Sequence, residues 1–100
     1  MTFANVGSLE AQPGRGTELV EILTRPNPDL GPIGCLAYAV GVDPEAPDTV
    51  LVSELWTSAE AHQASLTLPS VQAAIAEARP LLTGVMGGFR FAVQGSPLEP

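Results

Sequence analysis

The chain has 100 residues, a length that suits one domain with a thin hydrophobic core. Its formal net charge is −7 with only four basic residues, which argues against a nucleic-acid partner and against an anionic membrane surface. The single cysteine, Cys35, excludes an intrachain disulfide and any metal site built on several cysteines.

The N-terminal residues have no basic region followed by a long apolar run, so we expect no signal peptide and a cytoplasmic location. Residues 3–11 are expected to form the first strand, and residues 12–16 contain turn-forming glycine and proline. Thr17 is placed to cap a helix. The apolar stripe of that helix is Leu19, Val20, Ile22 and Leu23. Pro26 ends the helix by Arg25, because proline cannot continue one.

The middle of the chain predicts a β-hairpin after a loop. Residues 27–34 are expected to form the loop, and residues 35–42 the second strand, with Cys35 as a small buried residue. The turn-rich segment 43–48 connects this strand to a third strand at 49–56.

Side chains of the third strand alternate between the two faces of the sheet. One face receives Val50, Val52, Glu54 and Trp56. The other receives Leu51, Ser53 and Leu55. The first face is expected to meet the helices, which places Glu54 and Trp56 toward the interior.

Two helices are expected after the third strand. Thr57 and Glu60 have the spacing of a capping box, which predicts a short helix ending at about Leu66. Pro69 suits the first turn of a second helix, and Pro80 ends it. The buried stripe of the second helix is expected to be Val71, Ala74, Ile75 and Ala78.

Residues 85–93 are expected to form the last strand, which completes the order β-α-β-β-α-(α)-β. This order is the ferredoxin-like α+β arrangement, a four-stranded antiparallel sheet with helices on one face. We expect one domain over residues 1–94 and a flexible tail over residues 95–100. Because Leu51 and Leu55 lie on the uncovered face, we expect two copies to pair through their sheets as a homodimer.

Four segments, in this order and spacing, resemble the antibiotic biosynthesis monooxygenase family. They lie at residues 12–19, 34–40, 53–62 and 69–75. The most specific is the third, where Glu54-Leu55-Trp56 is followed by a short helix that contains His62. The likeness covers residues 3–94.

The resemblance implies a dimeric α+β barrel with a pocket between sheet and helices. Many members oxidise quinols or polycyclic phenols with O2 and use no metal, flavin or other cofactor, whereas others degrade haem. It therefore implies a small aromatic substrate and O2 as partners, and no cofactor. A polyketide cyclase or isomerase, or a non-catalytic small-molecule-binding dimer, is the alternative on the same fold.

The sequence departs from the family pattern at one position. Many members carry a histidine nine residues after the tryptophan, where this chain has Ser65. Haem-degrading relatives need a histidine at or beside that position as axial ligand, so the sequence disfavours haem. The change also favours the alternative function over oxygenation.

Three residues are the candidate catalytic groups. Trp56 would line the pocket, or it is a core tryptophan whose N–H meets a nearby acceptor. Glu54, if desolvated, could act as a base, or it is a structural partner of a backbone amide or of an arginine such as Arg90. His62 is the best candidate base, because imidazole changes protonation near neutral pH, or it is a partly exposed helix residue.

The expected substrate-binding residues come from the second and third strands and the two helices after them. They are Tyr38, Val52, Ser65, Leu66, Val71 and Ile75. With one histidine and one cysteine, the sequence predicts no metal site.

Overall fold

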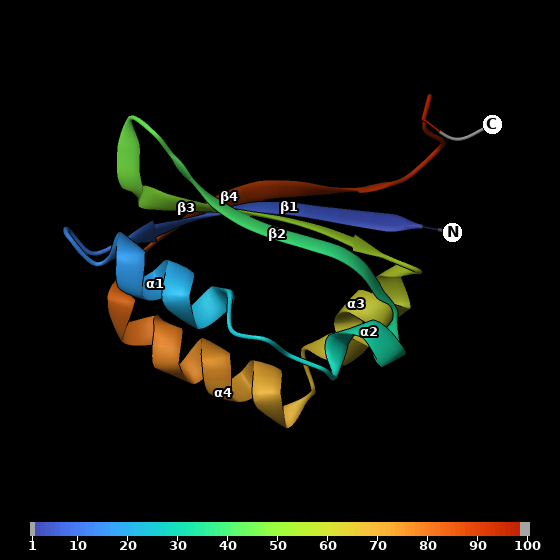
Figure 1. The fold of residues 1–100 in the computed structure, drawn as a ribbon, viewed down its shortest axis with the longest axis horizontal. Coiled ribbons are helices and arrows are strands. Elements are labelled where there is room, and N and C mark those ends of the chain that lie inside the picture. Colours follow the sequence, from blue (N-terminus) through green and yellow to red (C-terminus); the bar gives the residue numbers. More distant parts are fainter. Residues whose placement is uncertain (1, 99–100) are drawn as a thin grey trace.

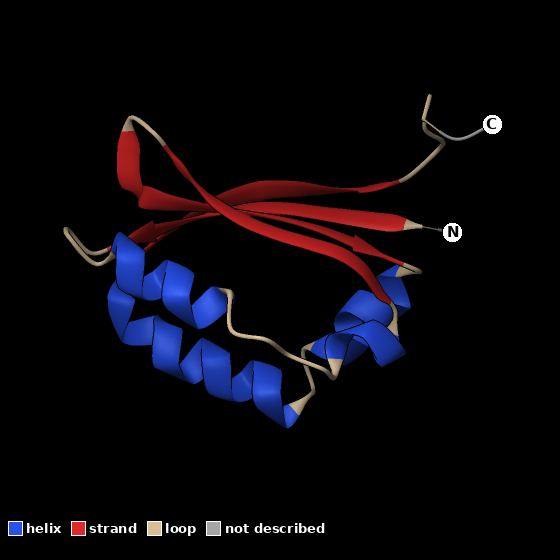
Figure 2. Ribbon diagram, in the orientation of Figure 1, coloured by secondary structure: helices blue, strands red, loops and turns tan. Residues whose placement is uncertain are grey.

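The computed structural model describes residues 2–98, which form an antiparallel sheet with helices on one of its faces (Figures 1 and 2). The strands are β1 (Phe3–Ala11), β2 (Cys35–Asp43), β3 (Ala46–Trp56) and β4 (Leu82–Ala92). The helices are α1 (Gly16–Leu23), α2 (Leu30–Ile33), α3 (Ala59–Ser65), α4 (Pro69–Ala78) and the 3-10 helix η1 (Arg79–Leu81). The strand order is β2-β3-β1-β4, which confirms the predicted ferredoxin-like α+β fold.

The hydrophobic core lies at one end of the sheet, where α1, α4 and η1 pack beneath it (Figure 1). Leu19 of α1 and Val50 of β3 are fully buried there. The remaining buried core residues are Ala11, Ile22, Ala78 and Leu81. The other two helices, α2 and α3, pack together at the opposite end of the sheet (Figure 1). The middle of the inner sheet face therefore lies between two groups of helices.

The first helix is not capped by Thr17 as expected. It begins at Gly16, and the Asp48 carboxylate of the β2–β3 hairpin accepts hydrogen bonds from the backbone N–H groups of Gly14 and Gly16 at 2.9 and 3.0 Å. A Cβ at position 16 would collide with the Pro47 carbonyl, so glycine is needed for this approach. The cap comes from a segment distant in sequence, which local pattern cannot reveal.

Several other boundaries also differ from the expected ones. The expected loop at 27–34 contains the short helix α2, and the third and fourth strands begin at Ala46 and Leu82, three residues earlier than expected. The helix after β3 is capped by Ser58, whose Oγ accepts from the Ala61 N–H at 3.0 Å, and not by Thr57.

Two burial expectations also change. In α4 only Ala78 is buried, and Ile75 is 42% exposed, because the part of this helix that carries Ile75 borders an open cavity. Cys35 is half-buried rather than fully buried.

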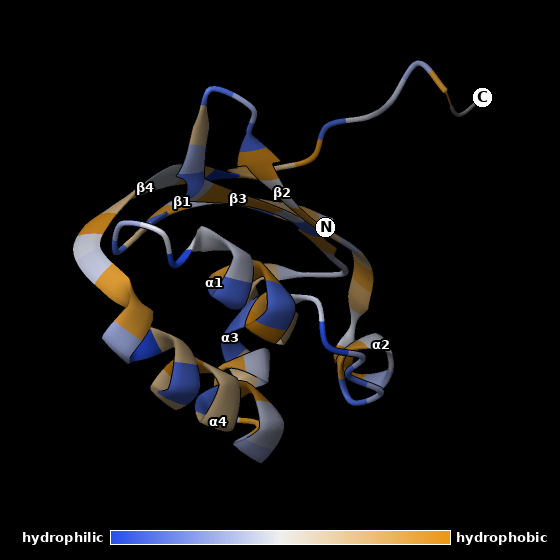
Figure 3. Cartoon of the chain, turned by 60° about the vertical axis from the view of Figure 1, so that its left-hand side comes forward, coloured by the Kyte–Doolittle hydropathy of each residue, from blue (hydrophilic) through white to orange (hydrophobic). Residues whose placement is uncertain are grey.

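Within residues 2–98, no helix covers the outer face of the sheet, which carries several apolar side chains. Leu51 of β3, Val6 of β1 and Phe89 and Phe91 of β4 share this face by strand alternation and register. The rings of Phe89 and Phe91 stack at 6.3 Å, and these side chains are 63% and 48% exposed. In Figure 3 orange segments alternate with white and blue ones along the strands.

The expected tail begins at Gly95, and residues 95–98 form no helix or strand; residues 99–100 lie outside the described residues. Within residues 2–98, no helix is long and apolar enough to cross a membrane.

Replacing Asp48 with alanine should lower the free energy of unfolding by about 1 kcal/mol, because α1 loses the acceptor at its N-terminus. For a domain of this size that corresponds to a fall in Tm of about 4–8 °C, measurable by thermal denaturation. The control is Glu45→Ala, a change in the same hairpin at an exposed residue. Equal melting temperatures for the two variants would contradict this role of Asp48.

Candidate active site

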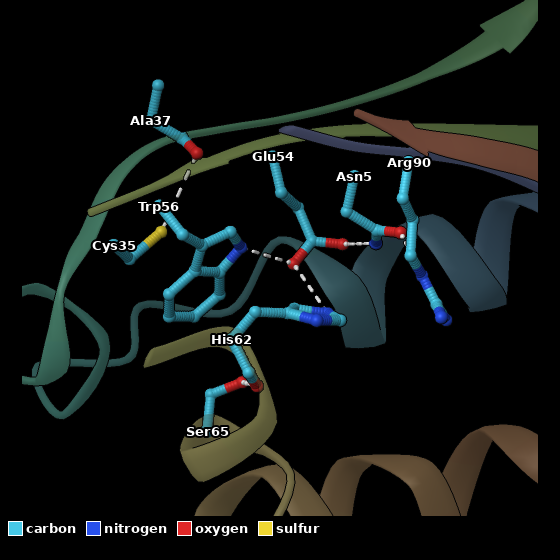
Figure 4. Close-up of polar contacts among 8 residues, drawn as sticks. All are labelled: Asn5, Cys35, Ala37, Glu54, Trp56, His62, Ser65 and Arg90. Carbon is cyan, nitrogen blue, oxygen red and sulfur yellow. Dashed lines mark hydrogen bonds and ion pairs between the residues drawn. The ribbon is translucent and has the colours of Figure 1, made fainter. Parts of the chain in front are cut away.

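The Glu54 carboxylate is the centre of the polar contacts on the inner face of the sheet (Figure 4). Glu54 is only 9% exposed, and both of its oxygens accept hydrogen bonds. Oε1 accepts from Trp56 Nε1 at 3.1 Å, and Oε2 accepts from Asn5 Nδ2 at 2.7 Å. A buried carboxylate needs such donors, because desolvation without them costs several kcal/mol. Strand alternation puts Trp56 beside Glu54, and the β1–β3 register puts Asn5 directly across from it.

His62 faces this carboxylate from the opposite side of the cavity (Figure 4). Its Nε2 lies 4.0 Å from Glu54 Oε1, a distance at which protonated imidazole and carboxylate attract each other. The imidazole is also held by aromatic rings, with centroids 5.6 Å from Phe3 and 5.5 Å from Trp56 in an edge-on arrangement. His62 is 5% exposed, so it is a buried residue and not the exposed helix residue of the alternative interpretation.

Ser65 lies one turn after His62 and is also buried. Its Oγ donates a 2.6 Å hydrogen bond to the backbone carbonyl of His62. The hydroxyl therefore has a partner within its own helix, and Ser65 lines the cavity without being a free donor.

Two polar residues of the site were not predicted as site residues. Asn5 stands between Glu54 and Arg90, and its Oδ1 accepts from Arg90 Nε at 3.2 Å. Arg90 thus reaches Glu54 through the Asn5 amide, and the direct Glu54–Arg90 pair that the sequence left open as one alternative is not formed. The three residues lie at matching register positions of β3, β1 and β4, and this pairing is the information that could have identified them.

A cavity of about 870 Å³ opens between the inner sheet face and the helices. All nine predicted site residues line it: Tyr38, Val52, Glu54, Trp56, His62, Ser65, Leu66, Val71 and Ile75. Asn5, Arg25 and Arg90 line it as well. The structure therefore brings together residues from both ends of the chain around one volume large enough for a small organic molecule.

The negative charge of Glu54 acts on two neighbouring groups of β2. Burial, with a smaller contribution from the Glu54 carboxylate, raises the pKa of Tyr38 to about 12. The same two causes raise the pKa of the Cys35 thiol, while its contact with the Ala37 carbonyl acts in the opposite direction. At neutral pH both groups are protonated, so Tyr38 presents a phenolic O–H to the cavity.

No group of three or more histidine, cysteine, aspartate or glutamate residues that could hold a metal ion occurs within residues 2–98. The polar groups of the site are suited to proton transfer and hydrogen bonding.

Comparison with known proteins identifies the family to which this architecture belongs. The sequence model described as "Antibiotic biosynthesis monooxygenase" matches residues 2–77. The chain belongs to this family. The family supports a monooxygenase-like role and leaves the substrate open.

Solved structures agree with this assignment. A Chloroflexus aurantiacus protein, provisionally named an antibiotic biosynthesis monooxygenase, is 37% identical, with a TM-score of 0.83 over 96% of each chain. A provisionally named member from Deinococcus radiodurans is 25% identical, with a TM-score of 0.74 over 96% of this chain and 95% of its own. One from Caulobacter crescentus is 23% identical (TM-score 0.76, covering 93% and 91%) and shows the shared fold. A search among curated proteins found no match.

The tyrosine of this chain offers a direct test of the site's electrostatics, because Tyr38 is its single tyrosine. Tyrosinate absorbance at 295 nm should appear with a midpoint near 12. Because the folded pKa lies above the ordinary value of 10, the folded protein should lose stability as pH rises from 10 toward 12.

The matched variants are Tyr38→Phe, which should lose less stability over this range, and Glu54→Gln, which should lower the midpoint by removing the carboxylate charge. A midpoint at 10 in the folded wild-type protein would contradict the burial of this phenol.

Proposed function

We propose that the protein is a cofactor-independent monooxygenase that oxidises a small phenol or quinol with O2. The observation that carries the proposal is the buried pair of His62 and Glu54 inside an apolar cavity. Both Glu54 oxygens already accept a hydrogen bond, so His62 is the base and Glu54 stabilises the imidazolium that forms.

The reaction begins when His62 removes the phenolic proton of the substrate. The electron-rich phenolate gives one electron to O2, which leaves an organic radical and superoxide. These two radicals combine at a ring carbon, and the imidazolium returns its proton to the resulting peroxide. Loss of water from the hydroperoxide yields the quinone, so one substrate molecule and one O2 give one quinone and one water. The substrate supplies all the electrons.

The cavity also favours the reaction by excluding water. Val52, Leu66, Val71 and Ile75 make much of its wall apolar. Few water molecules then compete for the phenolate, and electrostatic interactions within the site are stronger than in water. The protein's share is therefore orientation, desolvation and one proton transfer.

Ser65 supports the alternative function. It occupies the position where many family members carry a histidine, and its hydroxyl is bonded to the His62 carbonyl. The site thus has one imidazole, which is sufficient for the acid–base chemistry of a cyclase or isomerase acting on a polyketide. A non-catalytic binding dimer would use the same cavity without the proton transfer.

The decisive measurement is O2 uptake by metal-free protein with 1,4-naphthohydroquinone, corrected for the rate without protein. The variant His62→Ala should lower the protein-dependent rate about 10²–10⁴-fold, because the proton transfer is lost. Arg15→Ala is the control, since it removes an exposed ion pair with Glu18 on α1. Circular dichroism of both variants verifies folding.

Unchanged uptake in His62→Ala would remove this residue as the base. Absence of uptake across a panel of phenols and quinols would shift the assignment to the cyclase, isomerase or binding alternative.

We also propose that the functional unit is a homodimer formed through the outer faces of two sheets. Within the stretch of β1, β3 and β4 that carries Val6, Leu51 and Phe89, the outer face has no charged side chain, although the chain carries a net charge of −7. A second copy is the occupant that fits this face, because two identical apolar surfaces can meet without bringing like charges together.

Sedimentation should give a mass of twice 10.3 kDa for the wild-type chain. Phe89→Glu should weaken the dimer by about 100-fold or more, because each copy would bury an unpaired carboxylate in the interface. The matched control is Leu98→Glu, which adds the same charge at a residue that is 92% exposed and lies beyond the sheet. A wild-type chain that sediments as a monomer at high concentration would rule out this interface.

A further inference from the structure

Arg90 is the cation in the cavity wall whose charge is not matched by an ion pair within residues 2–98. The other arginine that lines the cavity, Arg25, forms a two-point ion pair with Glu77 at 2.6 and 2.8 Å. Arg90 instead donates its Nε–H to the neutral amide oxygen of Asn5 at 3.2 Å. A guanidinium has five N–H donors, so this contact fixes the group and leaves its outer edge available.

The position of Arg90 relative to the reacting groups is fixed by the sheet. Glu54, Asn5 and Arg90 occupy one row across β3, β1 and β4. In Figure 4 the Arg90 side chain extends from the sheet past the Asn5 amide toward the helices. A molecule in the cavity could therefore meet His62 and Glu54 at one end and the guanidinium at the other.

The next row of the inner face has no side chain on β1 or β4, and Val52 of β3 borders it. Gly7 of β1 pairs with Gly88 of β4, and a hollow of about 430 Å³ lies over them, bordered by Asn5, Met86 and Arg90. Gly88 has φ of 134°, which side-chain-bearing residues rarely adopt. The hollow over these two glycines has room for a planar ring system beside the guanidinium.

We propose that Arg90 binds a carboxylate on the substrate, so that the substrate class is an aromatic acid whose ring lies over Gly7 and Gly88. This inference rests on the proposed function, because it takes the cavity as the substrate site. A guanidinium binds carboxylates with two parallel hydrogen bonds, which gives orientation as well as attraction.

The charge of Glu54 does not prevent this binding. Arg90 and Glu54 lie two strands apart, and the Asn5 amide stands between their side chains. A carboxylate in direct contact with the guanidinium would be about 2.8 Å from its N–H donors, so attraction exceeds the more distant repulsion. The chain's net charge of −7 weakens the nonspecific binding of anions. A higher affinity for the acid than for the neutral ligand would therefore report on this site.

The test compares two ligands that differ by one carboxylate, 1-hydroxy-2-naphthoate and 1-naphthol, by isothermal titration calorimetry. Neither requires O2 for binding. The wild-type chain should bind 1-hydroxy-2-naphthoate about 10-fold more tightly than 1-naphthol, a difference of about 1.4 kcal/mol. Arg90→Gln should abolish that preference and leave the affinity for 1-naphthol within about twofold, whereas Arg90→Lys should keep part of it.

Two further variants separate charge from shape. Arg15→Gln is the control for loss of a positive charge elsewhere, and it should bind both ligands as the wild type does. Gly7→Val should weaken both ligands, because a side chain there would fill the floor of the hollow; its Cβ would lie at ordinary contact distance, 3.4 Å, from Val52.

The proposal is overturned if the wild-type chain binds 1-naphthol as tightly as the acid, or binds neither ligand. It is also overturned if Arg90→Gln weakens both ligands equally, since Arg90 would then only position Asn5. The oxygenase assignment can fail while the Arg90 proposal holds. That result would be a preference for the acid that depends on Arg90, together with no O2 uptake. O2 uptake with a neutral quinol but no such preference overturns the Arg90 proposal alone.

Discussion

The site depends on one buried charge, the Glu54 carboxylate in the middle of the sheet. Removing a carboxylate from water costs several kcal/mol unless donors replace the lost hydration. Here the Trp56 indole and the Asn5 amide each provide one hydrogen bond, and His62 approaches from the helix side. Because the carboxylate holds the indole and the amide and faces the imidazole, the same contacts that make its burial tolerable also arrange the polar groups of the cavity.

This constraint explains how elements far apart in the sequence share one function. Asn5 and Glu54 are 49 residues apart, and Asn5 and Arg90 are 85 apart, yet they lie in one row because β1 is paired on both sides. The core is concentrated at the α1 end of the sheet, so the row itself is not covered by packed aliphatic side chains. The stability of the fold and the openness of the site are therefore provided by different ends of the same sheet face.

The sequence predicted those features that depend on short-range periodicity. Alternation along the third strand placed Glu54 and Trp56 together on the inner face, and the nine predicted site residues do line the cavity. Roles for those residues stay predictions, since lining a cavity is a matter of geometry. What the sequence could not provide was strand register, and so Asn5 was missed as a site residue and the contact between Asn5 and Arg90 was not foreseen.

The helix starts were mispredicted for a related reason. The cap of α1 is Asp48, which is 32 residues from Gly16, and local sequence favoured Thr17 instead. Between Thr57 and Ser58 the residue types are nearly equivalent, and only the path of the chain leaving β3 decides that Ser58 receives the Ala61 N–H. Ile75 has the spacing of a core residue but borders the cavity. Periodicity identifies the apolar stripe of a helix, but it does not say whether protein side chains or a ligand cover that stripe.

The two faces of the sheet differ in how their side chains are covered within the single chain. The inner face holds the Glu54 carboxylate, which takes its hydrogen bonds from within the chain, whereas the outer face has exposed aromatic rings with no covering element in residues 2–98. A thin domain of this size gains stability most directly by covering such a face with another apolar surface. Pairing of two sheets would leave both cavities on the outside of the assembly, each still bounded by its own helices. On this arrangement, association stabilises the sheet that holds Glu54 without closing the entrance through which a substrate must pass.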